Sequence, residues 1–292
     1  MYNLAALDFA LSGTIFAGKL HYAPTTASTN VDASAAARRG EPHGSVYLAD
    51  EQLAGRGRGG HAWISAAGEG LYVSVVLRPR FSAARLPLLP LATGLAAARA
   101  IHAAAALAVD LRWPNDLLIG ARKAGGILIE AGTNSEGPPH AVLGIGINVH
   151  QRAFPPDLAT PATSLDLETG APSVRGPQEA ISASRGGNDR SSSLGWKSSR
   201  HISRQVLLVA LLKSLEREAL VLENPDAAKG IVARVEKAST WMRGRMVEVH
   251  GPQACTGVTA GLDENGFLCV TTAEGVVTVQ TGGLREKLAS SC

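Results

Sequence analysis

Residues 112–128 read RWPNDLLIGARKAGGIL, a segment in which polar residues and glycines interrupt two apolar stretches. Residues 109–113 have strand character, and the Pro-Asn-Asp that follows is typical of a turn. Lys123 stands seven residues after Asp116, directly before Ala-Gly-Gly-Ile-Leu, and a second strand is predicted over 126–130. Taken singly, Asn115 and Asp116 are ordinary turn residues and Lys123 an ordinary solvated lysine, so their meaning depends on the motifs around them.

Helices and further strands are predicted on both sides of this segment. Ser28-Thr29-Asn30 should cap a helix that ends at Gly40, because Ser and Thr bind free N–H groups at a helix start and Gly ends helices. Apolar residues at helical spacing predict a long helix over 204–222. The other predicted elements are helices over 4–11, 86–107 and 227–237 and strands over 14–22, 45–49, 71–77 and 141–149. Pro24 is expected to stop the first of these strands.

After residue 240 the sequence pattern changes and predicts short strands separated by turns. Strands are predicted over 246–250, 256–262, 267–272 and 276–280, which favours a small SH3-like β-barrel. We therefore expect an α+β protein: residues 1–239 form a mixed β-sheet domain flanked by helices, and residues 240–292 a small β-domain. Residues 171–200 hold eight Ser, four Gly and two Pro, a composition typical of a flexible insertion.

Composition excludes several classes of protein. With 292 residues, 45% apolar and 18% charged, the chain resembles a globular protein, and no run of about 18 apolar residues predicts a membrane span. Three cysteines without a C-x-x-C pair, and no H-E-x-x-H, argue against a metal site and a disulfide framework. The N-terminal apolar residues lack a basic region and a cleavage site, so a cytoplasmic protein is expected.

Charge is another candidate signal, because 28 Lys+Arg against 25 Asp+Glu leave a net charge of +3. Residues 171–200 alone contain five basic and two acidic residues, and the rest of the chain holds 23 of each sign. The surplus thus belongs to the predicted insertion and does not indicate a nucleic-acid partner.

The glycine-rich stretch at 55–60, GRGRGG, formally satisfies G-x-G-x-x-G. A dinucleotide-binding turn would open a helix and be followed by an acidic residue about 20 positions later, and neither follows here. Neither a Walker loop nor a nucleophile elbow occurs. Arg56 and Arg58 instead offer guanidinium groups on a flexible backbone, which suits closure over a carboxylate or phosphate, although a plain surface loop is an alternative.

Together the motifs resemble the ordered series found in biotin protein ligases, over roughly residues 14–170 and 203–288. They are Ser28-Thr29-Asn30, Gln52, Gly55-Arg56-Gly57-Arg58-Gly59 with Trp63, residues 112–116, Lys123-Ala124-Gly125-Gly126-Ile127-Leu128 and Gly144-Ile145-Gly146-Ile147-Asn148-Val149. The resemblance implies the class II synthetase-like fold of that family with its SH3-like C-terminal domain. It also implies an enzyme that uses ATP and Mg²⁺ to convert biotin to biotinyl-5′-AMP, then joins biotin to a lysine of a biotin carboxyl carrier domain.

The resemblance assigns roles to individual residues. Ser28, Thr29 and Gln52 would bind the ureido head of biotin, with Asn30 and the backbone of Gly55 and Gly57 beside them. Helix capping is the alternative role for Ser28 and Thr29. Trp63 and Asn148 would receive adenine, although core packing is an equal alternative for Trp63.

The remaining roles concern the reacting groups. Lys123 would lie between the carboxylate and the α-phosphate, next to Gly125 and Gly126, while Arg56 and Arg58 close over the adenylate. Asp116 would orient or deprotonate the acceptor lysine, and Asn115 would contact the phosphates or Mg²⁺.

The chain departs from the family pattern in two places, and other readings stay open. Arg112 stands where many relatives have Lys, and the 27 residues before Ser28 leave no room for the DNA-binding domain of repressor forms, so a monofunctional ligase, monomeric or homodimeric, is expected. The alternatives are a lipoate-type ligase, whose Arg-Arg-x-Ser-Gly-Gly-Gly loop is missing, a non-catalytic biotin-binding protein, and a basic nucleic-acid-associated module.

Overall fold

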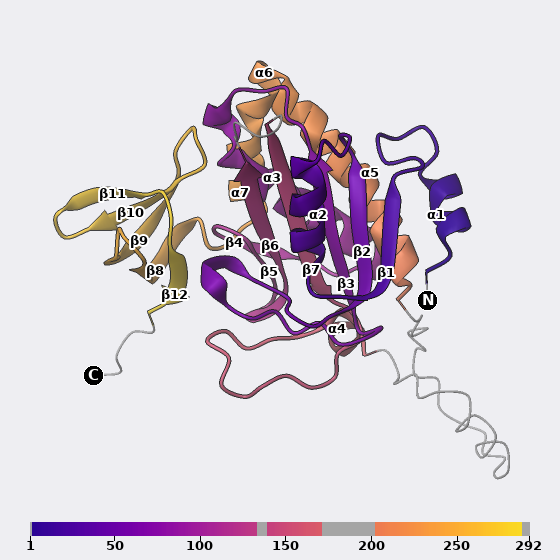
Figure 1. The fold of residues 1–292 in the computed structure, drawn as a ribbon. Coiled ribbons are helices and arrows are strands. Elements are labelled where there is room, and N and C mark those ends of the chain that lie inside the picture. The colour runs from indigo at the N-terminus through magenta and orange to yellow at the C-terminus, as the bar shows by residue number, and fades with distance from the viewer. Residues whose placement is uncertain (1, 133–138, 171–201, 288–292) are drawn as a thin grey trace, which may run out of the picture.

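The computed structural model describes residues 2–132, 139–170 and 202–287. A seven-stranded mixed sheet forms its centre, in the order β1-β2-β3-β7-β6-β5-β4 (Figure 1). Its strands are β1 (Leu20–Thr26), β2 (Ser45–Gln52), β3 (Gly70–Leu77), β4 (Asp110–Arg112), β5 (Asp116–Ile119), β6 (Arg122–Gly132) and β7 (His140–Asn148). Only the β1–β2 pair in this sheet, as described, is parallel. All eight residues of β3 are buried, as expected of a central strand that is covered on both faces.

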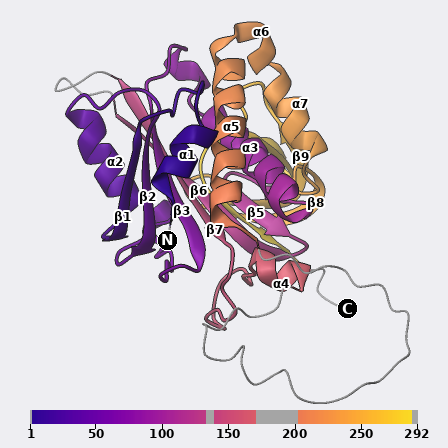
Figure 2. The same ribbon diagram turned by 90° about the vertical axis from the view of Figure 1, so that its right-hand side faces the viewer.

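Helices cover the two faces of this sheet (Figure 2). α2 (Thr29–Arg38) packs on β2, β3 and β7 through Ala33, Ala36 and Ala37, whose small side chains allow close approach. α3 (Leu88–Ala105) and α5 (Arg204–Glu223) pack together on the opposite face. The shorter helices are α1 (Leu4–Ala10), α4 (Leu165–Thr169), α6 (Pro225–Ala228) and α7 (Gly230–Lys237).

The C-terminal residues form a separate antiparallel sheet in the order β11-β10-β9-β8-β12, beside the β4 edge of the large sheet (Figure 1). Its strands are β8 (Arg243–His250), β9 (Cys255–Leu262), β10 (Leu268–Thr272), β11 (Gly275–Val279) and β12 (Gly283–Glu286). This sheet is consistent with the predicted SH3-like domain, although no pairing of β11 with β12 closes it within the described residues. The predicted boundary at residue 240 falls between α7 and β8, and one apolar core continues across it.

Several predicted boundaries were wrong. The first strand begins at Leu20, not at residue 14, and runs through Pro24; an edge strand tolerates the missing N–H of proline. Asp116, interpreted as a turn residue, begins β5, and β5, β12 and α4 were not predicted. The helix predicted over 227–237 is divided into α6 and α7. The insertion predicted over 171–200 lies outside the described residues.

α3 has the length and the mean hydropathy, 1.3, of a possible membrane span, the one such helix within the described ranges. However, 61% of this helix is buried inside the fold. Leu89, Ala96 and Ile101 are almost completely buried, as in the core helix of a globular domain. The apolar character of α3 is therefore explained by its central position.

Candidate functional site

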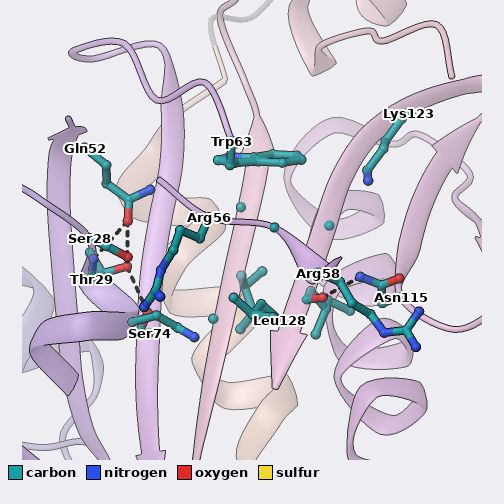
Figure 3. Close-up of a pocket in the computed structure, with 17 residues that line it drawn as sticks. Ser28, Thr29, Gln52, Arg56, Arg58, Trp63, Ser74, Asn115, Lys123 and Leu128 are labelled. Atoms are coloured by element: carbon teal, nitrogen blue, oxygen red, sulfur yellow. Dashed lines mark hydrogen bonds between the residues drawn. The ribbon is translucent and has the colours of Figure 1, made fainter. Parts of the chain in front are cut away.

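A pocket lies between the N-terminus of α2, the glycine-rich loop and strands β6 and β7 (Figure 3). Most of the residues that the motifs predicted for a site line it: Ser28, Thr29, Asn30, Gln52, Arg56, Gly57, Arg58, Trp63, Asn115, Lys123 and Gly126. The same pocket is also lined by Ser74, Ile127, Leu128, Gly144, Ile145 and Gly146. Residues that are distant in the sequence thus surround one cavity.

One end of the pocket is a network of uncharged polar groups. Gln52 Oε1 accepts hydrogen bonds from Thr29 N at 2.9 Å and Thr29 Oγ1 at 3.1 Å (Figure 3). The Ser74 hydroxyl contacts Thr29 Oγ1 at 2.8 Å and Asn30 Oδ1 at 2.7 Å. Ser28 occupies the N-cap position of α2, but its side chain makes no capping bond. These residues therefore form a fixed set of short donors and acceptors, with the Ser28 hydroxyl not used for capping.

The indole of Trp63 forms another wall, and two glycines make room for it. A Cβ at Gly146 would lie 2.6 Å from Cε2 and Nε1 of Trp63, and a Cβ at Gly126 would lie 3.4 Å from Cζ3. Glycine at these positions of β6 and β7 lets the ring lie directly against the backbone. The space that Gly146 leaves next to the backbone is thus filled by the Trp63 ring of this chain. Trp63 Nε1 is buried and has no hydrogen-bond partner among the described residues.

The glycine-rich loop folds back on itself and brings both arginines to the pocket. Gly57 N donates to His61 O at 2.7 Å, and Trp63 N donates to Gly55 O at 2.9 Å. Arg58 donates to Thr281 Oγ1 and to the carbonyl of Gly282, in the segment between β11 and β12. Burial lowers the pKa of the Arg58 guanidinium, an effect that the negative charge of Asp116 opposes. The loop therefore also contacts the C-terminal sheet.

Arg56 lies near Glu130, with 3.9 Å between Nη2 and Oε1. The other oxygen of Glu130 accepts a hydrogen bond of 2.8 Å from Asn30 Nδ2. Glu130 thus connects the polar end of the pocket to the arginine loop.

Charged groups dominate the other end of the pocket. Lys123 Nζ lies 2.5 Å from Asp116 Oδ1 and 5.6 Å from the centroid of the Trp63 ring. Arg112 Nη2 donates to Asp116 Oδ2 at 2.6 Å. Burial raises the pKa of Asp116, but the charges of Lys123 and Arg112 outweigh it and leave this pKa below its ordinary value. Asp116 is therefore an anion that holds two cations, and one of these, Lys123, lines the pocket.

Four predicted residues lie behind the lining of the pocket. Gly55 and Gly125 are in close backbone contact, since a Cβ there would lie 2.4 Å from Trp63 O and 2.8 Å from Gly146 O respectively. Asp116 contacts the lining through its ion pair with Lys123. Asn148 donates to Thr163 O at 2.9 Å and to Lys123 O at 3.4 Å, so its amide supports the backbone of Lys123.

Sequence reasoning missed Ser74 and Glu130. Ser74 is fully buried within the apolar strand β3, and a lone serine in an apolar run was the available signal. Glu130 was included only as the end of a predicted strand. Asn115 is in the lining as predicted, and its Nδ2 also donates to Ile127 O at 2.7 Å, which joins β5 to β6.

The described residues contain no group of three or more His, Cys, Asp or Glu side chains suited to a metal ion. Near the pocket, both oxygens of Asp116 bind cationic side chains, so this carboxylate does not fit a resident metal. A divalent cation that enters with phosphate groups needs few protein ligands, and this remains compatible with the pocket.

Comparison with known proteins finds several relatives of this chain. The model of the biotin/lipoate A/B protein ligase family matches residues 22–148. A biotin–[acetyl-CoA-carboxylase] ligase of Mycobacterium tuberculosis is 31% identical over 267 residues, which cover 88% of this chain and 85% of that protein. The bifunctional ligase/repressor BirA of Bacillus subtilis is 37% identical over 166 residues, which are 56% of this chain. The match spans about half, 51%, of that curated relative.

Solved structures show the same fold. The biotin protein ligase of Aquifex aeolicus in complex with biotin and ATP superimposes with a TM-score of 0.72 at 26% identity, over 92% of this chain and all of that one. The structural match extends past residue 148, where the family model ends, and so covers most of the described elements.

Proposed function

Since this chain belongs to the biotin protein ligases of the biotin/lipoate A/B protein ligase family, we propose that it attaches biotin to a protein lysine at the expense of ATP. In the first step the biotin carboxylate attacks the α-phosphate of ATP and pyrophosphate leaves, which gives biotinyl-5′-AMP. In the second step the ε-amine of an acceptor lysine attacks the acyl carbon, AMP leaves and an amide forms. The acceptor is a biotin carboxyl carrier domain, in keeping with the name of the Mycobacterium tuberculosis relative.

One observation carries this proposal: a single pocket has an uncharged polar end and a cationic end. The polar end, with Thr29, Gln52 and the hydroxyl of Ser28, suits the ureido head of biotin, whose N–H and C=O groups must be paired when buried. The cationic end, with Lys123 and Arg58, suits a carboxylate and a phosphate, while Arg56 lies beside the polar end, 3.9 Å from Glu130 (Figure 3). An elongated acid bound with its head at the polar end therefore directs its carboxylate toward the cations.

Lys123 is the residue that we assign to the first step. Two anions must approach each other when the carboxylate attacks the α-phosphate, and negative charge increases on the phosphoryl oxygens. The Lys123 ammonium, held by Asp116, is a fixed positive charge at this end of the pocket and needs little rearrangement. Arg56 and Arg58 add two guanidinium groups from the loop. The cation carried by MgATP is part of that substrate.

Asp116 is assigned a positioning role rather than that of a base. A general base needs a pKa near the working pH, whereas the pKa of Asp116 is lowered by two ion pairs. Trp63 offers a flat surface to the adenine, and Asn148 holds the backbone on which Lys123 stands. The loop closes the pocket and limits hydrolysis of the mixed anhydride.

The proposal extends to the setting of the reaction. We propose that the protein acts in the cytoplasm; in support, Cys255 and Cys269 are free thiols. A carrier domain, and not a nucleic acid, is the proposed macromolecular partner. Light scattering of the purified chain, with and without biotin, would distinguish a monomer from a homodimer.

The direct test is to incubate the protein with biotin, MgATP and a biotin carboxyl carrier domain and to measure the intact mass of the carrier. We expect one added biotinyl group, and none when the acceptor lysine of the carrier is replaced by arginine. Transfer from lipoate instead of biotin would support the lipoate-ligase alternative. Biotin binding without pyrophosphate release would support a non-catalytic binding protein and refute the proposed activity.

A further inference from the structure

Arg112, at the end of β4, is a guanidinium that is only 8% exposed. Its Nε and Nη2 donate to Asp116 Oδ2 at 3.1 and 2.6 Å, and Nη2 also donates to Thr160 Oγ1 at 2.8 Å. The guanidinium carbon lies 5.1 Å from the centroid of the Trp241 ring. Arg112 is thus held by a carboxylate, a hydroxyl and an aromatic ring.

Trp241 lies in the segment between α7 and β8 and is 5% exposed. A second guanidinium, that of Arg245, approaches the same ring, at 4.8 Å from the centroid. Arg245 is itself anchored, since it donates to Thr240 Oγ1 at 2.9 Å and to Glu286 Oε1 at 2.6 Å. The indole therefore has two cationic neighbours, and one of them belongs to the C-terminal sheet.

The backbone beside Trp241 is fastened to the strand that carries Arg112. Thr240 N and Oγ1 donate to the carboxylate of Asp110 at 2.9 and 2.6 Å, and Ser239 Oγ donates to Leu111 O at 2.5 Å. Trp241 N in turn donates to Ser239 Oγ at 3.0 Å. Ser239 and Thr240, the two residues before Trp241, therefore fix the position of the indole relative to β4 through their hydrogen bonds.

The contacts continue from Arg112 into the pocket. Asp116 Oδ2 accepts from Arg112, while Asp116 Oδ1 binds Lys123 Nζ at 2.5 Å. An unbroken series of contacts, Trp241 to Arg112 to Asp116 to Lys123, thus connects the C-terminal segment with the ammonium in the pocket. A planar guanidinium can stack on the indole and bind a carboxylate at the same time, which the ammonium of a lysine at position 112 would not do equally well.

We propose that Trp241 is a positioning residue: it fixes the guanidinium of Arg112 and, through Asp116, the place of the Lys123 ammonium. The inference rests on the proposed function for its consequence in catalysis, but the positioning itself is a property of the ligand-free chain. Without the aromatic face, Arg112 gains rotational freedom and Asp116 moves with it. The C-terminal segment then contributes to acyl-adenylate formation without touching either substrate.

The test uses the full chain and does not depend on activity. Brief labelling with an amine-acylating reagent, read by peptide mass spectrometry, reports how accessible each lysine is. In Trp241→Leu, we expect labelling of Lys123 to rise about tenfold or more relative to the exposed Lys229, the factor that corresponds to one lost charged hydrogen bond. Unchanged labelling of Lys123 would overturn the proposal.

Two further variants separate positioning from general destabilisation. Trp241→Phe keeps an aromatic face and should restore most of the protection of Lys123, even where Trp241→Leu folds poorly. Val270→Ala removes buried volume from β10, away from the series, and should leave the labelling of Lys123 unchanged. Equal labelling in the Phe and Leu variants would refute a role for the aromatic ring.

The catalytic consequence is measured separately, by biotin-dependent exchange of pyrophosphate into ATP. We expect kcat to fall between about 10- and 100-fold in Trp241→Leu, as for a small misplacement of a catalytic group, with the Kd for biotin unchanged. In an Arg112→Leu background, the same replacement should add no further loss. An inactive parent protein with protected Lys123 would refute the proposed function and retain the positioning role. A Trp241→Leu variant with normal kcat would refute the proposed catalytic consequence of that role.

Discussion

Replacement of Gly146 by alanine should separate ATP binding from biotin binding. An ideal Cβ at this position lies 2.6 Å from Trp63 Cε2 and Nε1 and 2.9 Å from Cζ2. Non-bonded carbon atoms are comfortable at about 3.5–4.0 Å, so the ring must move by about 1 Å. The ring is carried by a loop, whereas Gly146 lies inside β7 and is paired on both sides, so the ring should yield.

Two magnitudes follow from this displacement. Overpacking a tightly filled site costs about 1–3 kcal/mol, and relief by the loop should keep the loss of unfolding free energy near the lower end. A displacement of about 1 Å at a substrate-positioning group can reduce the rate by about 100-fold. We therefore expect a large rise in the KM for ATP, or a large fall in kcat, with a small change in stability. The biotin Kd should stay within about twofold, because the contacts among Thr29, Gln52 and Ser74 are unaffected.

The assay is pyrophosphate exchange at varied ATP, combined with calorimetric titration of biotin and urea unfolding. Gly230→Ala is the matched control, since a Cβ at Gly230 would have nothing within 4 Å. That variant should behave like the parent protein. A Gly146→Ala variant with an unchanged KM for ATP and unchanged kcat would refute the idea that the Trp63 ring shapes the nucleotide site.

Three further changes have definite expected outcomes. Lys123→Ala should keep the fold and lose adenylate formation by about 100-fold or more, because the transition-state charge is uncompensated; a near-normal rate of pyrophosphate release would contradict this. Arg58→Gly removes the loop contact to Thr281 and should let the adenylate escape, seen by mass spectrometry as biotin on bystander lysines, whereas strict carrier specificity would argue against a closing loop. Asp116 has a lowered pKa, so its ionised form stabilises the fold above the ordinary value of 3.8, and this contribution disappears as the pH falls through the lower folded-state pKa. Urea unfolding of the parent and Asp116→Asn should accordingly differ most near about pH 7 and converge toward about pH 2.

Local signals in the sequence predicted the helices well. Ser28 and Gly40 mark the two ends of α2 as expected, although the Ser28 side chain makes no capping bond, and Ser203 caps α5; helix ends depend on a few neighbouring residues. The strands were less predictable at their ends. The sequence predicts that the first strand ends at Pro24, but β1 continues through it. Because β1 is an edge strand, the missing N–H of proline does not interrupt the pairing with β2. Strand assignments depend on neighbours that the local sequence does not name.

The residues of the site likewise divide into those that a local sequence pattern predicts and those that it does not. Ordered motifs predicted Lys123, Arg56 and Gln52 as members of one site, because their residue types carry recognisable chemistry, and the three residues line the same pocket. Ser74 and Glu130 were missed, since a serine in an apolar strand and a glutamate at a strand end have no distinctive local pattern. Both residues join the pocket through hydrogen bonds with Asn30, which is 44 residues from Ser74 and 100 residues from Glu130 in the sequence.

The sequence by itself determined which groups this protein can use: a helix start rich in hydroxyls, a glycine loop with two arginines and a lysine beside a glycine pair. Only the tertiary structure decided how these groups act on one another. The pairing of β6 with β7 sets Gly126 directly beside Gly146, where the Trp63 ring lies, and packing of the C-terminal segment sets Trp241 against Arg112. The physical reason is that side-chain chemistry is a property of single residues, whereas distance and burial, which set charge interactions, arise when the chain is packed.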